Sequence, residues 1–440
     1  MSELVLIVDD EPGILTTLGG ILSDEGYATV STTSGAEALS LYEERRPALV
    51  FLDIWLADRD GLETLQALRE SDPTAAVIMM SGHGTAATAV RAIKMGAFDY
   101  LEKPLSYRRA VEAAAGALSY RRSLADGELA GSPADRRGRS GRSGRSEPER
   151  TFSPPPPLPL LAPSGRRQRT LAHGTVVYGH GLHSGQRTGM SLQPLPPASG
   201  VHFVTLPTGR EIPAHVAAVA DTDYATTLAA DGESIRTVEH LLSALHAYGV
   251  GNLLIKVHGE IPVMDGSALE FCKLLEEVGL EEQAEGGQEI VIDRRYEVSD
   301  GKNGGEKLLA IEPAEGFSVS YLLRYPPPLG EQYFEFTLAD PETYQREIAP
   351  ARTFGFMKDL KMMNELGLGS GGRLDNFILV GEDEIVNTEL RFPDEFVRHK
   401  ILDILGDLYL LGYPIRGKVT ARLTGHRDNI ALLRKIVAGG

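Results

Sequence analysis

The run Leu4-Val5-Leu6-Ile7-Val8 forms a short apolar stretch near the start of the chain, and the carboxylates of Asp9 and Asp10 follow it directly. Comparable apolar runs recur further along, at 48–52, 76–80 and 99–101. The stretches between these runs have the periodicity of amphipathic helices. Strands that alternate with helices in this way are typical of an α/β domain with a doubly wound parallel sheet. We therefore predict such a domain for residues 1–120.

Polar side chains follow these apolar runs at the points where the predicted strands end. They are Asp9, Asp10, Asp53, Ser81 and Lys103. Ligands of open α/β sheets bind at this carboxyl edge, and carboxylates gathered there suit Mg²⁺, which takes hard oxygen ligands. In these positions the chain resembles the receiver domain of two-component response regulators.

This resemblance implies a phosphorylation site within residues 1–120. Asp53 would accept a phosphoryl group, and Asp9 and Asp10 would hold Mg²⁺ together with it. The groups that sense the phosphoryl group would be Ser81, Tyr100 and Lys103. A cognate histidine kinase is the partner that such a domain implies.

Residues 121–168 have a different composition, which predicts a linker. Arg, Gly and Ser dominate 135–146, and a proline run follows at 154–159. Neither composition can build a core, so we expect a flexible tether that continues into a stiffer polyproline stretch. The arginines would alternatively form a patch for nucleic acid or anionic lipid. No aromatic residues are interleaved with them, which favours the tether.

From residue 169 onward, strand-like runs mix with helical stretches. The strand-like runs include 175–178 and 252–257, and the predicted helices span 237–248, 268–278 and 395–411. This is an α+β pattern, and two successive strand–helix units predict two subdomains. We expect the boundary in the Glu- and Gly-rich run near residue 285, which gives subdomains at 169–285 and 286–440.

A possible metal site begins with His399 and Asp403, which lie four residues apart in a helix-like run. Side chains at i and i+4 share one face of a helix, so both can point at one metal ion. A second helix would then have to supply His240. Three such ligands leave a position for water, and Glu239 stands where a general base is needed. The same spacing also occurs on solvated helix faces, so spacing alone leaves both interpretations open.

Longer motifs follow one another in order through the same region. They are Arg169-Thr170-Leu171, Gly181-Leu182-His183-Ser184-Gly185, Thr237-Val238-Glu239-His240-Leu241, Ile261-Pro262-Val263-Met264-Asp265-Gly266-Ser267, Ala351-Arg352-Thr353-Phe354-Gly355-Phe356 and Arg398-His399-Lys400. With these motifs, residues 169–440 resemble the zinc-dependent UDP-3-O-acyl-N-acetylglucosamine deacetylases of lipid A biosynthesis. The resemblance implies an α+β fold of two similar two-layer subdomains with the active site between them.

The resemblance also implies a reaction, the hydrolysis of the N-acetyl group of a UDP-activated, acylated glucosamine. The Zn²⁺ ligands would be His240, His399 and Asp403. Glu239 would take a proton from the attacking water.

Further residues would support this reaction. Thr353 and a protonated His426 would stabilise the oxyanion, and Asp407, one turn beyond Asp403, would keep His426 charged. Either His426 or Glu239 would protonate the leaving amine.

Two residues are expected to bind substrate. Lys400 lies about 100° around the helix from His399, so we expect its side chain to face the substrate and not the metal. Phe354 would pack on the sugar or nucleotide.

Composition limits the partners and the compartment. The net charge of -17 argues against broad nucleic-acid binding. The single cysteine, Cys272, excludes an intrachain disulfide and fits a reducing compartment. The first apolar run is too short for a signal sequence, and no stretch approaches the roughly 20 apolar residues of a transmembrane segment. We expect a cytoplasmic protein of a Gram-negative type of bacterium, as lipid A biosynthesis implies.

Two classes of function compete at this point. The chain is either a working deacetylase that its receiver domain modulates, or a non-catalytic signalling protein whose deacetylase-like part binds a ligand or partner. The joint presence of Glu239, Thr353, Asp407 and His426 favours the enzyme. For regulation we expect docking or dimerisation that depends on phosphorylation.

Overall fold

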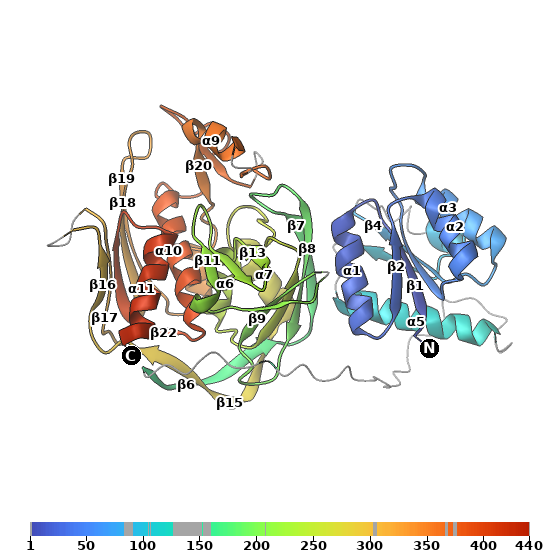
Figure 1. The fold of residues 1–440 in the computed structure, drawn as a ribbon, viewed down its shortest axis with the longest axis horizontal. Helices are drawn as coiled ribbons and strands as arrows, with labels where there is room; N and C mark the ends of the chain where they lie inside the picture. Colours follow the sequence, from blue (N-terminus) through green and yellow to red (C-terminus); the bar gives the residue numbers. More distant parts are fainter. Residues whose placement is uncertain are drawn as a thin grey trace. The chain divides into compact units, whose positions relative to one another are not determined.

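The computed structural model describes residues 2–439 except 83–90, 104, 106, 126–151, 153–159, 207, 302–305, 366–367 and 373–375. The described chain forms two compact units, one built mainly from residues 1–150 and the other mainly from 151–440 (Figure 1). Most of the predicted tether, including the Arg-, Gly- and Ser-rich run 135–146 and the proline run 154–159, lies outside the described residues.

The N-terminal unit contains a five-stranded parallel sheet in the order β2-β1-β3-β4-β5. Its strands are β1 (Leu4–Val8), β2 (Ala28–Thr32), β3 (Leu49–Asp53), β4 (Val77–Ser81) and β5 (Asp99–Glu102). Every residue of β3 and β4 is buried, which explains why these strands read as continuous apolar runs. The prediction of a doubly wound parallel sheet is confirmed.

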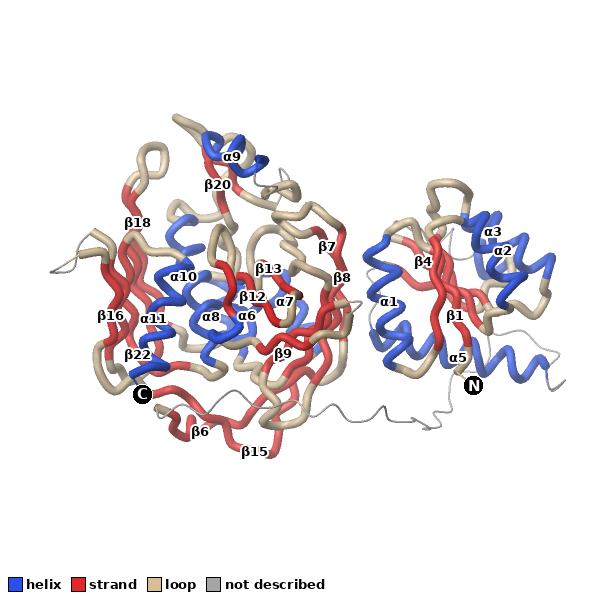
Figure 2. The backbone as a smooth tube through the Cα atoms, viewed as in Figure 1, coloured by secondary structure: helices blue, strands red, loops and turns tan. Residues whose placement is uncertain are grey.

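Helices cover both faces of this sheet (Figure 2). They are α1 (Pro12–Asp24), α2 (Gly35–Arg45), α3 (Gly61–Ser71) and α5 (Tyr107–Ala125). One core cluster contains residues of α1 and α5, and the other contains residues of α2 and α3. The side chains of Ser34 and Asp60 cap α2 and α3 by accepting backbone N–H groups, which fixes where these helices begin.

The second unit begins with a half built on one mixed sheet and one small sheet. The mixed sheet has the order β10-β9-β14-β8-β7 and contains β7 (Thr175–His180), β8 (Arg187–Pro194), β9 (Val201–Thr205), β10 (Glu211–Pro213) and β14 (Leu253–Val257). The small sheet contains β11 (Val219–Asp221), β12 (Thr227–Ala230) and β13 (Glu233–Arg236). The helices are α6 (Glu239–Tyr248), which is buried along its whole length, and α7 (Leu269–Val278).

The other half is built on a seven-stranded sheet. Its strands are β6 (Leu161–Leu171), β15 (Leu280–Val291), β16 (Tyr296–Ser299), β17 (Leu308–Glu312), β18 (Phe317–Arg324), β19 (Glu331–Thr337) and β22 (Ile415–Arg422). Its main helices are α8 (Pro341–Glu347), α10 (Glu395–Leu408) and α11 (His426–Gly439). A smaller element contains β20 (Phe354–Phe356), α9 (Leu360–Glu365) and β21 (Ile378–Val380).

Two segments differ from the predicted boundaries. The Glu- and Gly-rich run near residue 285 lies inside β15, which pairs antiparallel with β6. The register of this pair shifts on both sides of Gly286, so the glycines accommodate an irregular strand and do not form a loop. The predicted linker is also shorter than expected, since α5 continues to Ala125 and β6 begins at Leu161.

Among the described residues, no helix combines the length and the apolar character needed to cross a membrane.

Candidate active site

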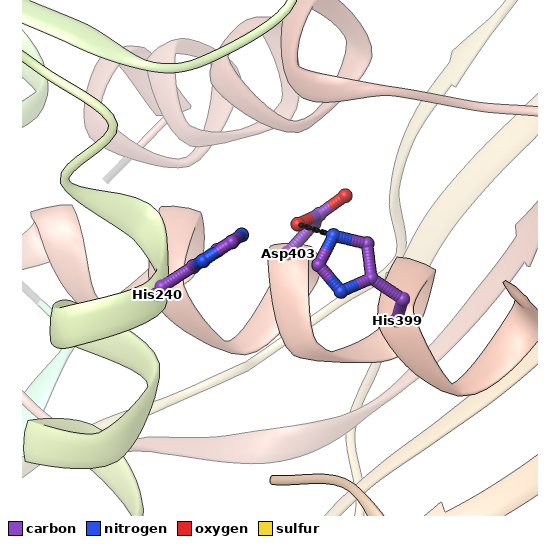
Figure 3. A group of neighbouring side chains, drawn as sticks. All are labelled: His240, His399 and Asp403. Carbon is purple, nitrogen blue, oxygen red and sulfur yellow. Dashed lines mark ion pairs between the residues drawn. The ribbon is translucent and has the colours of Figure 1, made fainter. Parts of the chain in front are cut away.

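The buried helices α6 and α10 bring three potential metal ligands together. His240 is the second residue of α6, and His399 and Asp403 lie one turn apart on α10. One nitrogen of each imidazole and one carboxylate oxygen lie within 4.8 Å of one another. Figure 3 shows the three side chains converging from the two helices. The sequence predicted this set, and the structure places it in one buried cluster.

The hydrogen bonding of these residues leaves atoms free for a metal ion. His399 donates its Nδ1–H to the carbonyl oxygen of Ala351 at 3.0 Å, which turns Nε2 toward Asp403 Oδ1 at 3.4 Å. Within the described chain, His240 Nδ1 and Asp403 Oδ1 are buried and have no hydrogen-bond partner. Two imidazole nitrogens and a carboxylate oxygen are a donor set that zinc accepts, and a bound metal would compensate for burying such atoms.

The protonation states of His240 and Asp403 also suit metal binding. Burial, followed by the nearby His399, lowers the pKa of His240 to about 3, which keeps its lone pair available. Burial raises the pKa of Asp403, but Lys400 and His399 outweigh it and hold that pKa well below its usual value. Neutral histidines and an ionised carboxylate are the forms that bind metals.

Lys400 was expected to face the substrate and not the metal, but its ammonium group contacts the carboxylate of a proposed metal ligand. Its Nζ lies 2.7 Å from Asp403 Oδ2 and 5.5 Å from the centre of the Phe354 ring. The long side chain reaches Asp403, three residues further along α10, whose carboxylate compensates for the partial burial of the ammonium group. Lys400 therefore lies between a metal-site carboxylate and the aromatic residue that was predicted to bind substrate.

Glu239 and His426 lie beside the metal-site residues. His426 Nε2 is 4.0 Å from Glu239 Oε1 and 3.8 Å from Asp403 Oδ2. Burial raises the pKa of Glu239 to about 8. Burial lowers the pKa of His426, but the carboxylates of Asp407 and Asp403 outweigh that effect and raise it to about 9. A buried carboxyl group and a protonated imidazole thus stand at one side of the site, a pairing suited to acid–base chemistry.

The predicted contact between Asp407 and His426 is present. His426 Nδ1 donates to Asp407 Oδ2 at 2.8 Å. Two residues that were not predicted complete the group: Thr226 donates its hydroxyl to Asp407 Oδ1 at 2.6 Å, and Asn429 donates its amide to Oδ2 at 2.8 Å. Thr226 is 181 residues away from Asp407 in sequence, so no local pattern could have indicated this contact.

Aromatic rings lie next to the metal residues. The ring of Phe354 contacts those of Phe396 and His399 at centroid distances of 4.9 and 6.2 Å. Tyr325, which was not predicted, lies 6.1 Å from Phe354 and 5.0 Å from Phe356. These rings could stack on a sugar or a base.

Thr353 is fixed through its backbone. Its N–H donates to the carbonyl oxygen of Gly266, and its own carbonyl accepts the N–H of Ile378. It directly precedes Phe354 and lies two residues after Ala351, whose carbonyl orients His399.

The N-terminal unit gathers the predicted carboxylates at the carboxyl edge of its sheet. Oxygens of Asp9, Asp10 and Asp53 lie within 4.8 Å of one another. Lys103 Nζ lies 2.7 Å from Asp9 and 2.8 Å from Asp53. Burial raises the pKa of Asp9 to about 7, although Lys103 opposes this effect. Ser81 ends β4 and is buried.

Fold and sites together define a class of protein, in which a domain of receiver type is joined to an α+β unit with a candidate metal centre of hydrolytic type. Residues 168–438 match the family described as UDP-3-O-acyl N-acetylglycosamine deacetylase, and residues 5–115 match the response regulator receiver domain. The chain belongs to the UDP-3-O-acyl N-acetylglycosamine deacetylase family and also carries a receiver domain.

Two relatives are named UDP-3-O-acyl-N-acetylglucosamine deacetylase. The one from Anaeromyxobacter sp. (strain Fw109-5) is 43% identical over 274 residues, which cover 62% of this chain and 88% of the relative. The one from Myxococcus xanthus (strain DK1622) is 42% identical over 283 residues, which cover 63% of this chain and 88% of the relative. The solved receiver domain of NtrX from Brucella abortus is 45% identical, covers 26% of this chain and 98% of its own, and has a TM-score of 0.26.

Proposed function

We propose that the chain hydrolyses the N-acetyl group of UDP-3-O-acyl-N-acetylglucosamine and releases acetate and UDP-3-O-acyl-glucosamine in lipid A biosynthesis. Family membership and the names of the two relatives support this substrate. The observation that carries the proposal is the convergence of His240, His399 and Asp403 beside Glu239 and His426.

We propose that His240, His399 and Asp403 hold Zn²⁺. Their unpartnered buried atoms and their N, N, O donor set support this assignment. When bound, zinc would make a nucleophile available from water at neutral pH and would polarise the amide carbonyl.

The acid–base chemistry falls to Glu239 and His426. Oε2 of Glu239 accepts the N–H of Thr226 at 3.1 Å, so Oε1 is the oxygen that takes a proton from the attacking water. The new C–O bond forms the tetrahedral oxyanion, and His426 and Thr353 stabilise its charge. When the C–N bond breaks, the leaving nitrogen takes a proton from either His426 or Glu239.

Lys400 and Phe354 are proposed to bind the substrate. The Lys400 ammonium would contact hydroxyl or diphosphate oxygens, and Phe354 with its neighbour Tyr325 would stack on the sugar or the nucleotide.

The receiver domain is proposed to regulate this activity. Asp53 would accept a phosphoryl group from a cognate histidine kinase while Mg²⁺ binds to Asp9, Asp10 and Asp53. Lys103 would neutralise phosphoryl oxygens, and Ser81 and Tyr100 would respond to them.

Acetate release from the purified full chain tests the enzymatic proposal. We expect wild type to deacetylate UDP-3-O-acyl-N-acetylglucosamine and Glu239→Ala to lose at least about a hundredfold in kcat while it keeps its zinc. Glu285→Gln, on the exposed part of β15, serves as a control with unchanged turnover. Binding of the substrate by wild type without any acetate release would instead support a non-catalytic binding module.

A further inference from the structure

Thr226 is a fully buried residue that donates hydrogen bonds to Glu239 and Asp407 in the candidate active site. Its backbone N–H donates to Glu239 Oε2 at 3.1 Å, and its hydroxyl lies 2.6 Å from Asp407 Oδ1. Thr226 immediately precedes β12 in the first half of the deacetylase unit, whereas Asp407 and His426 belong to the second half. A single residue therefore connects the two halves at the site.

The donors and acceptors around Thr226 fix where the hydrogens lie. Since a carboxylate only accepts, the Thr226 hydroxyl is the donor to Asp407, and its single hydrogen is committed there. The same hydroxyl is 3.3 Å from His426 Nδ1 and therefore cannot donate to that ring. Nδ1 instead carries its own hydrogen, which it donates to Asp407 Oδ2 at 2.8 Å. His426 Nε2 is left facing Glu239 and Asp403.

We propose that Thr226 is a positioning residue for the deacetylation, an inference that rests on the proposed function. Its hydroxyl holds Asp407 in the orientation that directs His426 Nε2 into the site. Its N–H occupies Oε2 of Glu239 and so reserves Oε1 for proton transfer.

The hydroxyl and the N–H can be separated by mutation. Thr226→Val keeps the β-branched shape and the N–H but leaves Asp407 Oδ1 buried without its donor. Thr226→Ser keeps the hydroxyl. The matched control is Thr227→Val, because the adjacent hydroxyl accepts a long hydrogen bond from Arg236 Nε at 3.4 Å and contacts neither Glu239 nor Asp407 in the structure.

The test measures kcat, KM and zinc content of the full chain for each variant. A lost hydrogen bond to a charged group predicts that Thr226→Val lowers kcat about tenfold to a hundredfold, with KM changed by less than about threefold and zinc retained. The kcat of Thr226→Ser and the kcat of Thr227→Val should stay within about threefold of wild type, because the hydroxyl contact with Asp407 remains in both variants. A kcat of Thr226→Val close to wild type, an equal loss in Thr226→Ser, or a loss of zinc would each overturn the assignment.

A double-mutant cycle tests whether the hydroxyl acts through Asp407. In an Asp407→Asn background, Thr226→Val should lower kcat by less than about twofold, because the group that it positions is already changed. An undiminished effect in that background would contradict the proposal. Absence of turnover in wild type would instead refute the proposed function itself.

Discussion

Asp403 divides its two carboxylate oxygens between different neighbours. Oδ2 accepts the Lys400 ammonium at 2.7 Å, while Oδ1 lies 3.4 Å from His399 Nε2 and has no hydrogen-bond partner in the described part of the chain. One oxygen is thus neutralised by a lysine and the other remains available to a metal ion. The lysine orients the carboxylate as outer-shell groups of metal sites commonly do.

The proposed role of Asp53 as the phosphorylation site can be tested by mutating this one residue. Asp53→Asn should abolish labelling of the chain by acetyl phosphate with Mg²⁺, because an amide cannot form an acyl phosphate. Asp53 is the proposed acceptor, and Lys103 Nζ lies 2.8 Å from its carboxylate, where it could neutralise phosphoryl oxygens. Glu63→Gln on the exposed face of α3 should label like wild type, and phosphoprotein gels would record both. Labelling of Asp53→Asn at the wild-type level would exclude Asp53 as the acceptor.

Residues whose positions depend on local structure could be predicted from the sequence. Asp9, Asp53 and Ser81 were predicted together because strand ends in a parallel sheet meet at one edge. The contact of Thr226 with Asp407 could not be predicted, since it depends on how two distant segments pack. The ion pair of Lys400 with Asp403 was not predicted, because the angle around the helix does not show where the end of a long side chain lies.

At the level of elements, close packing of α6 on α10 holds the candidate metal centre. A Cβ at Gly406 of α10 would lie 2.0 Å from the backbone oxygen of Glu239 on α6, so only glycine fits there. The helix that carries His399 and Asp403 can therefore approach the helix that carries His240 closely enough to share a metal ion.

This contact predicts the effect of Gly406→Ala. In a helix this change would ordinarily stabilise, but here the methyl group should force α6 and α10 apart and cost about 1–3 kcal/mol of the free energy of unfolding, with weaker zinc binding. Urea unfolding and zinc titration would measure both effects. Gly316→Ala is the control in the same unit, since a Cβ there meets nothing within 4 Å. Wild-type stability and zinc affinity in Gly406→Ala would contradict this account of the helix contact.

Long periodic elements were predicted from the sequence more reliably than their ends. The predicted helix 237–248 begins at Glu239 in the structure because Thr237 has a φ of 61°, in the left-handed region, and cannot be helical there. The run near residue 285 was interpreted as a boundary from its glutamates and glycines. Pairing with β6 supplies the hydrogen bonds that make it a strand, and composition alone does not reveal that partner.

For the whole molecule, the central question is how the receiver domain would affect the deacetylase. A flexible tether of the predicted composition would transmit no strain from the receiver domain to the deacetylase. An effect of phosphorylation on the deacetylase therefore requires a new contact or a change of oligomeric state. Phosphorylation at Asp53 should therefore change kcat/KM for deacetylation or the mass in solution.

Acetate release measures kcat/KM and light scattering measures the mass in solution, each with and without a phosphodonor. Asp53→Asn provides the control, in which the phosphodonor should have no effect. Equal activity and equal mass in phosphorylated and unphosphorylated wild type would contradict regulation by docking or dimerisation.

We propose that His240, His399 and Asp403 hold the zinc ion with which the chain deacetylates its substrate. The most direct test of this claim follows acetate release from UDP-3-O-acyl-N-acetylglucosamine by the full chain as zinc is removed with a chelator and then returned. We predict that activity disappears with the zinc, returns in proportion to the zinc that is bound, and does not return in His399→Ala. Undiminished acetate release from the zinc-free chain, or none from the zinc-loaded chain, would contradict the claim.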